Sequence, residues 1–513
     1  MTHERSPAAD LNMNGPSRTD VLERVPGVRA VVVAVFAGVA GVGGSYAVAG
    51  FTPSFVAGPI AGVMARGMPD IVIRYAITVL GDLGDQLNLV TAVAIATALF
   101  AGAALAGTAA GRRTGVRPVG PFAAGGLATV VALVVTGAPL ASIGSGLAVG
   151  LVLAVAAVAS VPEVDGVSEG RRRVLGGAAS AVGLAGGGYL LGSGASTASG
   201  AGRPLGVSGA LRSEIDDLLG AADRQSLGVD GLEPLVSEEF YEVDINATDP
   251  TIDAAEWELT VTGAVEREVS YTYDELRGME AENRFVSLRC VGESRNGEKL
   301  DTALWTGVPI TDLVEPAGPG EECCVMLRAD DGFYEEFPLS ALEDGFLAFG
   351  MNGETLPRGH GYPARALIPG HWGEINVKWI TEIEVLEKEV DGYWEERGWH
   401  GTGPVNTVAK LHHERQLDDG RTQVGGHAYA GTRGVGSVEV STDGGNSWTE
   451  AELSEPLPGD DVWRQWIHTY DPPDGEHEVV VRAVEADGTV QPADETDAFP
   501  SGPSGWVSRT VRT

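Results

Sequence analysis

The chain has 513 residues, which is long for a single domain, so several domains are expected. Residues 1–205 hold 13 Lys and Arg against 10 Asp and Glu, a net charge of +3. The remaining residues hold 22 against 61, a net charge of −39, so the net charge of −36 arises from residues 206–513. Such a negative surface repels nucleic acid and argues against a DNA or RNA partner. It indicates a halophilic protein, in which concentrated salt screens the self-repulsion; an acidic surface that only aids solubility is the alternative.

Five apolar runs near the N-terminus are nearly free of charge. They are Ala30–Gly50, Val90–Ala110, Val119–Gly137, Ser142–Val161 and Val174–Leu191. Each is long enough, as a helix, to cross a hydrocarbon core of about 30 Å, and abundant Gly and Ala suit close helix packing in lipid. We therefore expect a cytoplasmic tail over residues 1–29 and a five-helix transmembrane domain over residues 30–191.

Arginines between the predicted spans indicate the orientation in the membrane. Arg112, Arg113 and Arg117 follow the second span, and Arg171–Arg173 precede the fifth. Positively charged loops stay in the cytoplasm, so residues 206–513 are expected on the extracytoplasmic side of a multi-pass cell-membrane protein. The three consecutive arginines also resemble a twin-arginine export signal; ordinary positive-inside charge is the alternative.

The predicted loop Phe51–Gln86 lies outside and contains a short apolar stretch, Ile71–Leu80, which Arg74 interrupts. We expect this stretch to be interfacial or re-entrant. No histidine lies between residues 4 and 359, and no cysteine precedes Cys290. A haem or an iron–sulfur cluster within the predicted bilayer segment is therefore excluded.

A linker is expected over residues 192–233, where a Gly- and Ser-rich tether leads to a short helix at Leu211–Gly220. Beyond it, residues 234–400 mix strands with short helices and lack a regular βαβ rhythm, which predicts an α+β domain. Alternation over Trp257–Gly263 predicts an early strand of this domain.

Residues 401–513 show strands alone, which predicts an immunoglobulin-like β-sandwich. Alternating apolar residues in Gly436–Trp448 surround a turn at Asp443–Gly445, a strong hairpin signal. Trp463–His468 and His477–Val484 alternate in the same way.

The chain has three cysteines, too few for a disulfide framework. Cys323 and Cys324 are adjacent in an apolar, strand-like run, where neighbouring side chains point to opposite faces. We expect both to be small core residues, which leaves Cys290 as the thiol with a chemical context.

Cys290 follows a predicted strand at Phe285–Leu288 and precedes Arg295 by five residues. About seventy residues later, the segment His360–Trp379 carries further cationic and imidazole groups. Taken singly, a cysteine in the core and charges on loops are ordinary features. Together, one thiolate to ligate a metal and several cations to neutralise a phosphate are what a metal–organophosphate cofactor needs.

In this order the two segments resemble the sulfite-oxidase family of molybdopterin enzymes over roughly residues 235–513. The resemblance implies a molybdenum–molybdopterin cofactor, with the metal bound by Cys290 and an oxyanion held by Arg295. The positions that it implies for the pterin phosphate are His360, Arg365 and Lys378. His371 lies between the last two, so we include it as a candidate pocket residue.

Two departures from the family pattern bear on the substrate. Soluble sulfite oxidases have a Tyr-Glu pair just before Met-Asn-Gly, whereas this chain has Phe349 and Gly350, so a hydroxyl is missing. Where those enzymes have an Arg-Asn-His cluster, Phe240–Asp244 places acids, which should weaken the capture of an anion. No cytochrome b5-type haem domain accompanies the motifs.

These features predict a membrane-anchored, molybdopterin-dependent oxidoreductase that oxidises sulfite or a related sulfur compound by oxygen-atom transfer. Reduction of an S-oxide or N-oxide is one alternative, and a surface binding protein with a vestigial cofactor site is another. Electrons should pass to or from a separate soluble carrier or a membrane quinone. The C-terminal domain pairs subunits in soluble family members, so the resemblance implies a homodimer.

Overall fold

The computed structural model describes residues 27–116, 118–158, 169–195, 202–320 and 323–512. These residues form two compact units. One comprises the described parts of Met1–Ile60 and Leu89–Ser196, and the other those of Ala61–Asn88 and Thr197–Thr513. The predicted cytoplasmic tail before residue 27, Arg117, part of the predicted linker and the side chains of Arg171–Arg173 lie outside the described residues.

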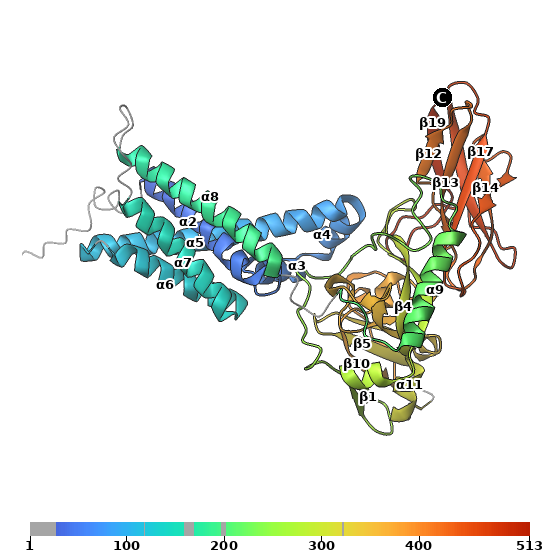
Figure 1. Cartoon of the computed structure of the whole chain (residues 1–513), viewed down its shortest axis with the longest axis horizontal. Coiled ribbons are helices and arrows are strands. Elements are labelled where there is room, and N and C mark those ends of the chain that lie inside the picture. Colours follow the sequence, from blue (N-terminus) through green and yellow to red (C-terminus); the bar gives the residue numbers. More distant parts are fainter. Residues whose placement is uncertain (1–26, 117, 159–168, 196–201, 321–322, 513) are drawn as a thin grey trace, which may run out of the picture. The chain divides into compact units, whose positions relative to one another are not determined.

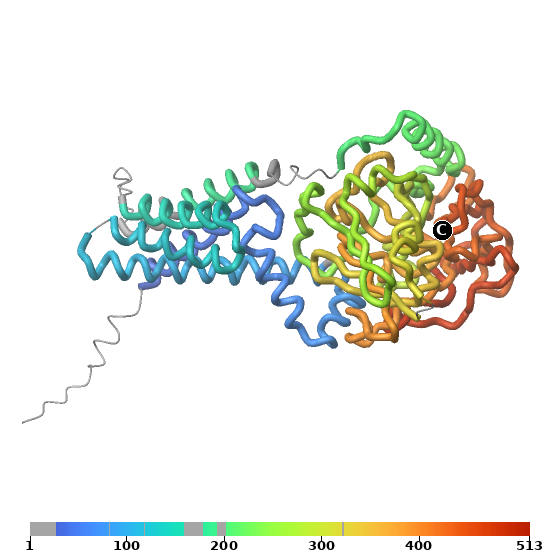
Figure 2. The backbone as a smooth tube through the Cα atoms, turned by 90° about the horizontal axis from the view of Figure 1, so that it is seen from below, coloured from blue at the N-terminus to red at the C-terminus, as the bar shows by residue number. Residues whose placement is uncertain are grey.

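The first unit is a helical bundle, drawn in blue and teal in Figures 1 and 2. Its helices are α2 (Val28–Ala49), α5 (Asp82–Thr114), α6 (Val119–Thr136), α7 (Pro139–Val158) and α8 (Glu169–Ala195). α2 packs against α7 and α8, and α6 packs against α7. Glycines make these approaches possible: a Cβ on Gly44 would lie only 2.4 Å from the carbonyl oxygen of Gly144.

Among the described residues, four helices are long and apolar enough to cross a membrane. They are Val28–Ala49, Leu83–Thr114, Val119–Thr136 and Pro139–Ala157, and they coincide with the first four predicted spans. The fifth predicted span lies in α8, of which the described apolar part, Ala178–Leu191, is shorter. By length and composition, the bundle is compatible with membrane anchoring.

The segment between the first two predicted spans is helical, and most of it folds with the second unit. It contains α3 (Ala57–Arg66), α4 (Asp70–Tyr75) and the π-helix η1 (Ala76–Leu80). Ile77 packs against the apolar core of the second unit, and the Arg74 guanidinium carbon lies 4.6 Å from the centre of the Phe499 ring. The sequence pattern did not predict these contacts.

The predicted α+β region is built on two five-stranded sheets (Figure 1). One has the order β2-β1-β10-β5-β6, with β1 parallel to β10, and the other has β3-β4-β7-β8 with β9 beside β7. The strands are β1 (Glu258–Gly263), β2 (Val269–Thr272), β3 (Glu282–Arg289), β4 (Leu300–Pro309), β5 (Cys324–Ala329), β6 (Tyr334–Pro338), β7 (Phe346–Met351), β8 (Glu354–Thr355), β9 (Arg365–Leu367) and β10 (Ile380–Leu386). β1 and β3 confirm the two strands predicted in this region.

One longer helix precedes these strands, and short helices and turns lie between and after them. They are α9 (Gly209–Gln225), α10 (Tyr273–Gly278), α11 (Thr311–Val314) and the 3-10 turns η2 (Glu315–Ala317), η3 (Leu339–Leu342), η4 (Arg358–His360), η5 (Gly373–Ile375) and η6 (Glu395–Arg397). α9 confirms the helix predicted in the linker region. η4, η5 and η6 carry residues of the candidate sites.

The C-terminal region forms two antiparallel sheets, drawn in orange and red in Figure 1. One contains β11 (Val408–Ala409), β12 (His413–Gln416), β13 (Thr422–Tyr429), β16 (Glu452–Leu453) and β17 (Arg464–Tyr470), and the other β14 (Val435–Ser441), β15 (Thr449–Glu450), β18 (Glu476–Glu485) and β19 (Val507–Arg512). β14 pairs with β15 across the predicted hairpin, where Gly444 and Gly445 have φ of 71° and 89°. The immunoglobulin-like arrangement of these sheets stays a prediction.

The prediction for Cys323 and Cys324 as two unlinked core residues is wrong, because a disulfide joins them. Cys324 is buried as the first residue of β5, whereas Cys323 precedes the strand and is exposed. Alternation of side chains between two faces holds within a strand. It does not apply to a pair that lies across the beginning of one.

Candidate molybdopterin site

Cys290 follows the last residue of β3 and begins a short loop. Its backbone N–H donates to the carbonyl oxygen of Lys299 at 3.0 Å, and its thiol is free. Burial raises the pKa of Cys290 to about 11, although the nearby Lys299 lowers it. A thiolate here therefore requires a strong positive partner. A metal ion is such a partner, since coordination deprotonates a thiol outright.

Apolar side chains surround the Cys290 loop. A Cβ on Gly292 would lie 2.7 Å from Cγ2 of Ile77, and 3.8 Å from both the Cys290 sulfur and Cη2 of Trp399. Ile77 belongs to the helical segment between the first two predicted spans. It is more than 200 positions from Cys290, so no local motif links it to this loop.

A buried cluster of charged side chains holds the backbone of the same loop. Glu293 accepts from Arg289 Nε at 2.7 Å and from Lys410 Nζ at 2.7 Å, and all three side chains are at most 2% exposed. Glu293 also accepts from the backbone N–H of Lys299 at 3.0 Å, and Lys410 donates to the carbonyl oxygen of Gly297 at 2.6 Å. Burial lowers the pKa of Lys410 to about 8. The sequence analysis missed this cluster.

The structure brings together the three residues predicted at the phosphate. Arg365, the first residue of β9, donates to the carbonyl oxygen of His360 at 3.3 Å, and Lys378 Nζ donates to that of Gly359 at 2.9 Å. Gly361 lies among them with φ of 107°, and a Cβ there would be 3.0 Å from Cβ of Arg365. His360 is the last residue of the 3-10 turn η4.

The positive charges of Arg365 and Lys378 suit an anionic ligand. Arg365 is 4% exposed and its Nε has no hydrogen-bond partner within the described part of the chain, where no carboxylate pairs with it either. Burial lowers the pKa of Arg365 to about 10. Burial, with Arg365 and Lys378 nearby, lowers the pKa of His360 to about 3, so the imidazole is neutral. A phosphate is a fitting partner for the buried guanidinium.

The acids of the 240–244 stretch lie beside these cations. Asp244 Oδ2 is 3.1 Å from Lys378 Nζ, and Glu242 Oε1 is 3.7 Å from His360 Nε2. Burial raises the pKa of Glu242. The acids identified in the sequence as unfavourable for an anion therefore contact two of the three phosphate candidates.

Tyr241 relates the two parts of the candidate site. Burial and then the Cys290 charge raise its pKa, whereas Arg365 lowers it, so the phenol lies within electrostatic reach of both. A Cβ on Gly373 would lie 2.8 Å from the Tyr241 hydroxyl oxygen. In the sequence, Tyr241 is marked only as a neighbour of Glu242, and no motif points to its hydroxyl.

The two other predicted site residues occupy different surroundings. Arg295 lies in the loop after Cys290, where its side chain is 31% exposed and pairs with Glu495 at 2.6 Å. His371 forms a bridge with Pro404, and its Nδ1 lies 2.9 Å from the carbonyl oxygen of Pro369. Phe349, which replaces the tyrosine of the soluble enzymes, is fully buried in the core.

Comparison with known proteins agrees with this geometry. Residues 246–394 match the family described as oxidoreductase molybdopterin binding domain, and residues 404–500 match the Mo-co oxidoreductase dimerisation domain. The C-terminal half is therefore a molybdopterin-dependent oxidoreductase, and its cofactor is molybdenum–molybdopterin.

Among known proteins, mitochondrial sulfite oxidase of Mus musculus is 28% identical over 297 residues, which cover 47% of this chain and 54% of that protein. Nitrate reductase [NADH] of Spinacia oleracea is 28% identical over 280 residues, or 42% of this chain and 30% of that one. The sulfane dehydrogenase SoxCD from Paracoccus pantotrophus aligns structurally with a TM-score of 0.46 at 20% identity, over 55% of this chain and 82% of that chain. Together these matches support a sulfite-oxidase-like molybdopterin oxidoreductase over residues 246–500. It spans about half the length of the mouse relative.

Proposed function

We propose that this protein is a membrane-anchored molybdenum oxidoreductase that oxidises sulfite or a related sulfur compound on the extracytoplasmic side. The observation that carries the proposal is the buried Arg365, which has no carboxylate partner among the described residues and lies beside His360 and Lys378, in the same domain as the free thiol of Cys290. When bound, the cofactor supplies two-electron redox chemistry with oxygen-atom transfer. Oxidation of sulfite takes one oxygen from water and releases two protons and two electrons.

The residues of the chain bind the cofactor and the substrate and position them for the reaction. Cys290 ligates the metal, and His360, Arg365 and Lys378 hold the pterin phosphate. Arg295 holds the substrate oxyanion once it leaves Glu495, and His371 lines the pocket. The two electrons pass to a separate soluble carrier or a membrane quinone.

The larger assembly is also part of the proposal. Residues 30–191 anchor the protein in the membrane, residues 192–233 link the anchor to the cofactor domain at 234–400, and residues 401–513 pair two chains. The match to a dimerisation domain and the four apolar helices support a membrane-bound homodimer. Export of the folded cofactor domain by the twin-arginine route fits Arg171–Arg173, which precede the apolar part of α8.

Reduction of an S-oxide or N-oxide is the second candidate. The acids at Glu242 and Asp244 and the missing hydroxyl at Phe349 disfavour an anionic sulfur substrate. The match to a nitrate reductase shows that related domains also occur in a reductase.

Steady-state kinetics of Arg295→Gln distinguish the two candidates. We expect KM for sulfite to rise at least tenfold with little change in kcat, because the oxyanion loses a charged hydrogen bond worth about 1.5–3 kcal/mol. Glu495→Gln, which frees Arg295, serves as the matched control and should not raise KM. An unchanged KM for sulfite in Arg295→Gln would rule out the oxyanion role, and turnover of dimethyl sulfoxide without any of sulfite would favour the reductase.

A further inference from the structure

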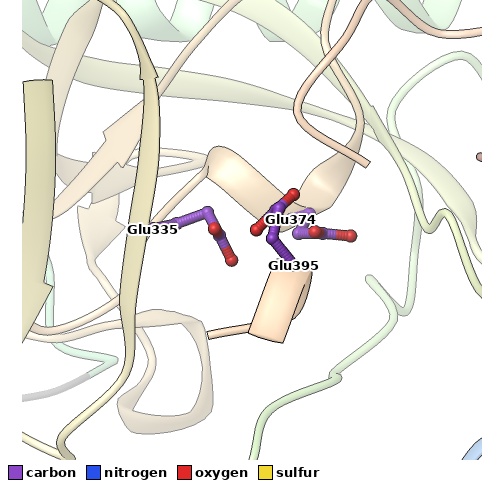
Figure 3. Close-up of side chains that lie close together, drawn as sticks. All are labelled: Glu335, Glu374 and Glu395. Carbon is purple, nitrogen blue, oxygen red and sulfur yellow. The ribbon is translucent and has the colours of Figure 1, made fainter. Parts of the chain in front are cut away.

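Three glutamates converge at a second place in the cofactor half, on elements far apart in the chain. Glu335 lies on β6, Glu374 on η5 and Glu395 on η6. Figure 3 shows their carboxylates pointing toward one another, and one oxygen from each lies within 4.8 Å of the other two. This is about the largest separation of two oxygens on one Ca²⁺, given Ca–O distances of about 2.3–2.6 Å.

Burial makes this arrangement costly without a ligand. Glu335 is 0% exposed and Glu374 is 9% exposed. Both carboxylate oxygens of Glu374 are buried and have no hydrogen-bond partner among the residues that the structure describes, and the same holds for Glu395. Glu335 accepts only long bonds, from the backbone N–H groups of Glu336 at 3.3 Å and Trp394 at 3.4 Å. In the described part of the chain, no Lys, Arg or His forms an ion pair with any of the three.

Glycines leave room for these carboxylates. A Cβ on Gly392 would lie 1.4 Å from Glu335 Oε1, and one on Gly401 would lie 2.1 Å from Glu374 Oε2. The carboxylates thus occupy space that any side chain at those positions would take. This is a separate observation from the acidity, and it indicates a site built to hold the three groups together.

We propose that Glu335, Glu374 and Glu395 form a binding site for one divalent cation, which we assign as Ca²⁺. A ligand set made only of carboxylate oxygens, without sulfur or imidazole, suits a hard cation. The ion compensates the negative charges of three carboxylates that form no ion pair with any other described residue. It also ties η5, which directly precedes the Asn376 carbonyl that accepts from Arg365 at 3.0 Å, to η6 and β6.

Calcium binding to the full-length, cofactor-loaded protein in detergent tests this proposal directly. After treatment with EGTA and desalting, we expect one Ca²⁺ per chain to rebind, and Tb³⁺ at the same site to luminesce when tryptophan is excited, since Trp394 adjoins Glu335. Glu374→Gln should weaken Ca²⁺ binding at least tenfold. Gly401→Ala, which displaces the carboxylate without removing its charge, should do the same.

Glu336→Gln is the matched control, because Glu336 is the next residue on β6 and points to the other face. It should bind Ca²⁺ like the unaltered protein. Two results would overturn the proposal. One is no stoichiometric Ca²⁺ on the unaltered chain, in which case the carboxylates share protons instead; the other is equal binding by Glu374→Gln, in which case the ion sits on surface acids. Neither readout depends on catalysis.

Discussion

At the scale of single residues, the Cys290 loop depends on the buried carboxylate of Glu293. Glu293 holds Arg289 and Lys410 together in a place that water does not reach, and it also holds the backbone at Lys299. The attraction within such a cluster repays the cost of burial only while all partners are present. Glu293 therefore positions the loop that carries the proposed metal ligand.

Replacing Glu293 with Gln leaves two cations buried without a counter-charge. We expect the free energy of unfolding to fall by about 3–5 kcal/mol, the range for breaking a buried ion pair on one side. Glu476→Gln at the exposed Arg512 pair is the control and should cost under about 1 kcal/mol. Thermal unfolding followed in detergent compares the two, and similar small losses in both would show that the buried cluster is not needed for stability.

The residues with a chemical motif could be proposed from the sequence, and their buried supports could not. Cys290, His360, Arg365 and Lys378 were proposed because their order resembles the sulfite-oxidase pattern. Glu293 and Lys410 are 117 positions apart, and a charge separated that far from its partner looks like any surface charge. The glutamate cluster could not be predicted for the same reason, because its members come from three separate elements.

At the scale of elements, strand positions followed from alternating residues, whereas contacts between distant elements did not. β1, β3, β14, β17 and β18 lie where alternation predicted strands. The helical segment with Ile77 was recognised as unusual, yet its packing beside the Cys290 loop has no counterpart in the local pattern. Periodicity reports which face of an element is buried, and it does not report what covers that face.

His427 on β13 gives an element-scale prediction about pH. Its ring stacks on Trp463 at 3.8 Å, and Nε2 donates to the carbonyl oxygen of Glu233 at 3.0 Å. Burial lowers the pKa of His427 to about 3. The unfolded chain therefore binds a proton below about pH 6.5 that the folded chain does not, so this contribution to stability is full above pH 6.5 and is lost as the pH falls toward 3.

Comparison of His427→Gln with the unaltered protein isolates this contribution. The amide keeps a donor for Glu233 and does not titrate. We expect the melting temperature of the variant to fall less than that of the unaltered protein between pH 7 and pH 5, both in high salt. An equal fall in the two proteins would contradict the assignment of a neutral, buried imidazole.

At the scale of the whole molecule, charge and hydropathy divide the chain into two chemically different parts. The first unit is apolar around its helices, and the second contains residues 206–513, which give the chain its net charge of −36. Repulsion among surface carboxylates destabilises a compact fold, and salt screens it. The melting temperature should rise steeply as NaCl increases from about 0.1 M to 1 M, where the Debye length falls from about 10 Å to 3 Å.

Comparison of two salts that differ only in their anion distinguishes charge screening from ion-specific effects on stability. Chloride and nitrate at equal ionic strength should raise the melting temperature alike if screening dominates. A melting temperature that is flat up to 1 M would show that the acidic surface serves solubility only.

The measurement that tests the central claim most directly is the molybdenum and pterin content of the full chain purified in high salt, together with Cys290→Ala. We predict about one molybdenum and one pterin per chain, with turnover abolished in the variant and the metal lost or left inactive. A folded, properly matured protein without molybdenum, or a Cys290→Ala variant that turns over substrate at the original rate, would contradict the assignment of Cys290 as the metal ligand.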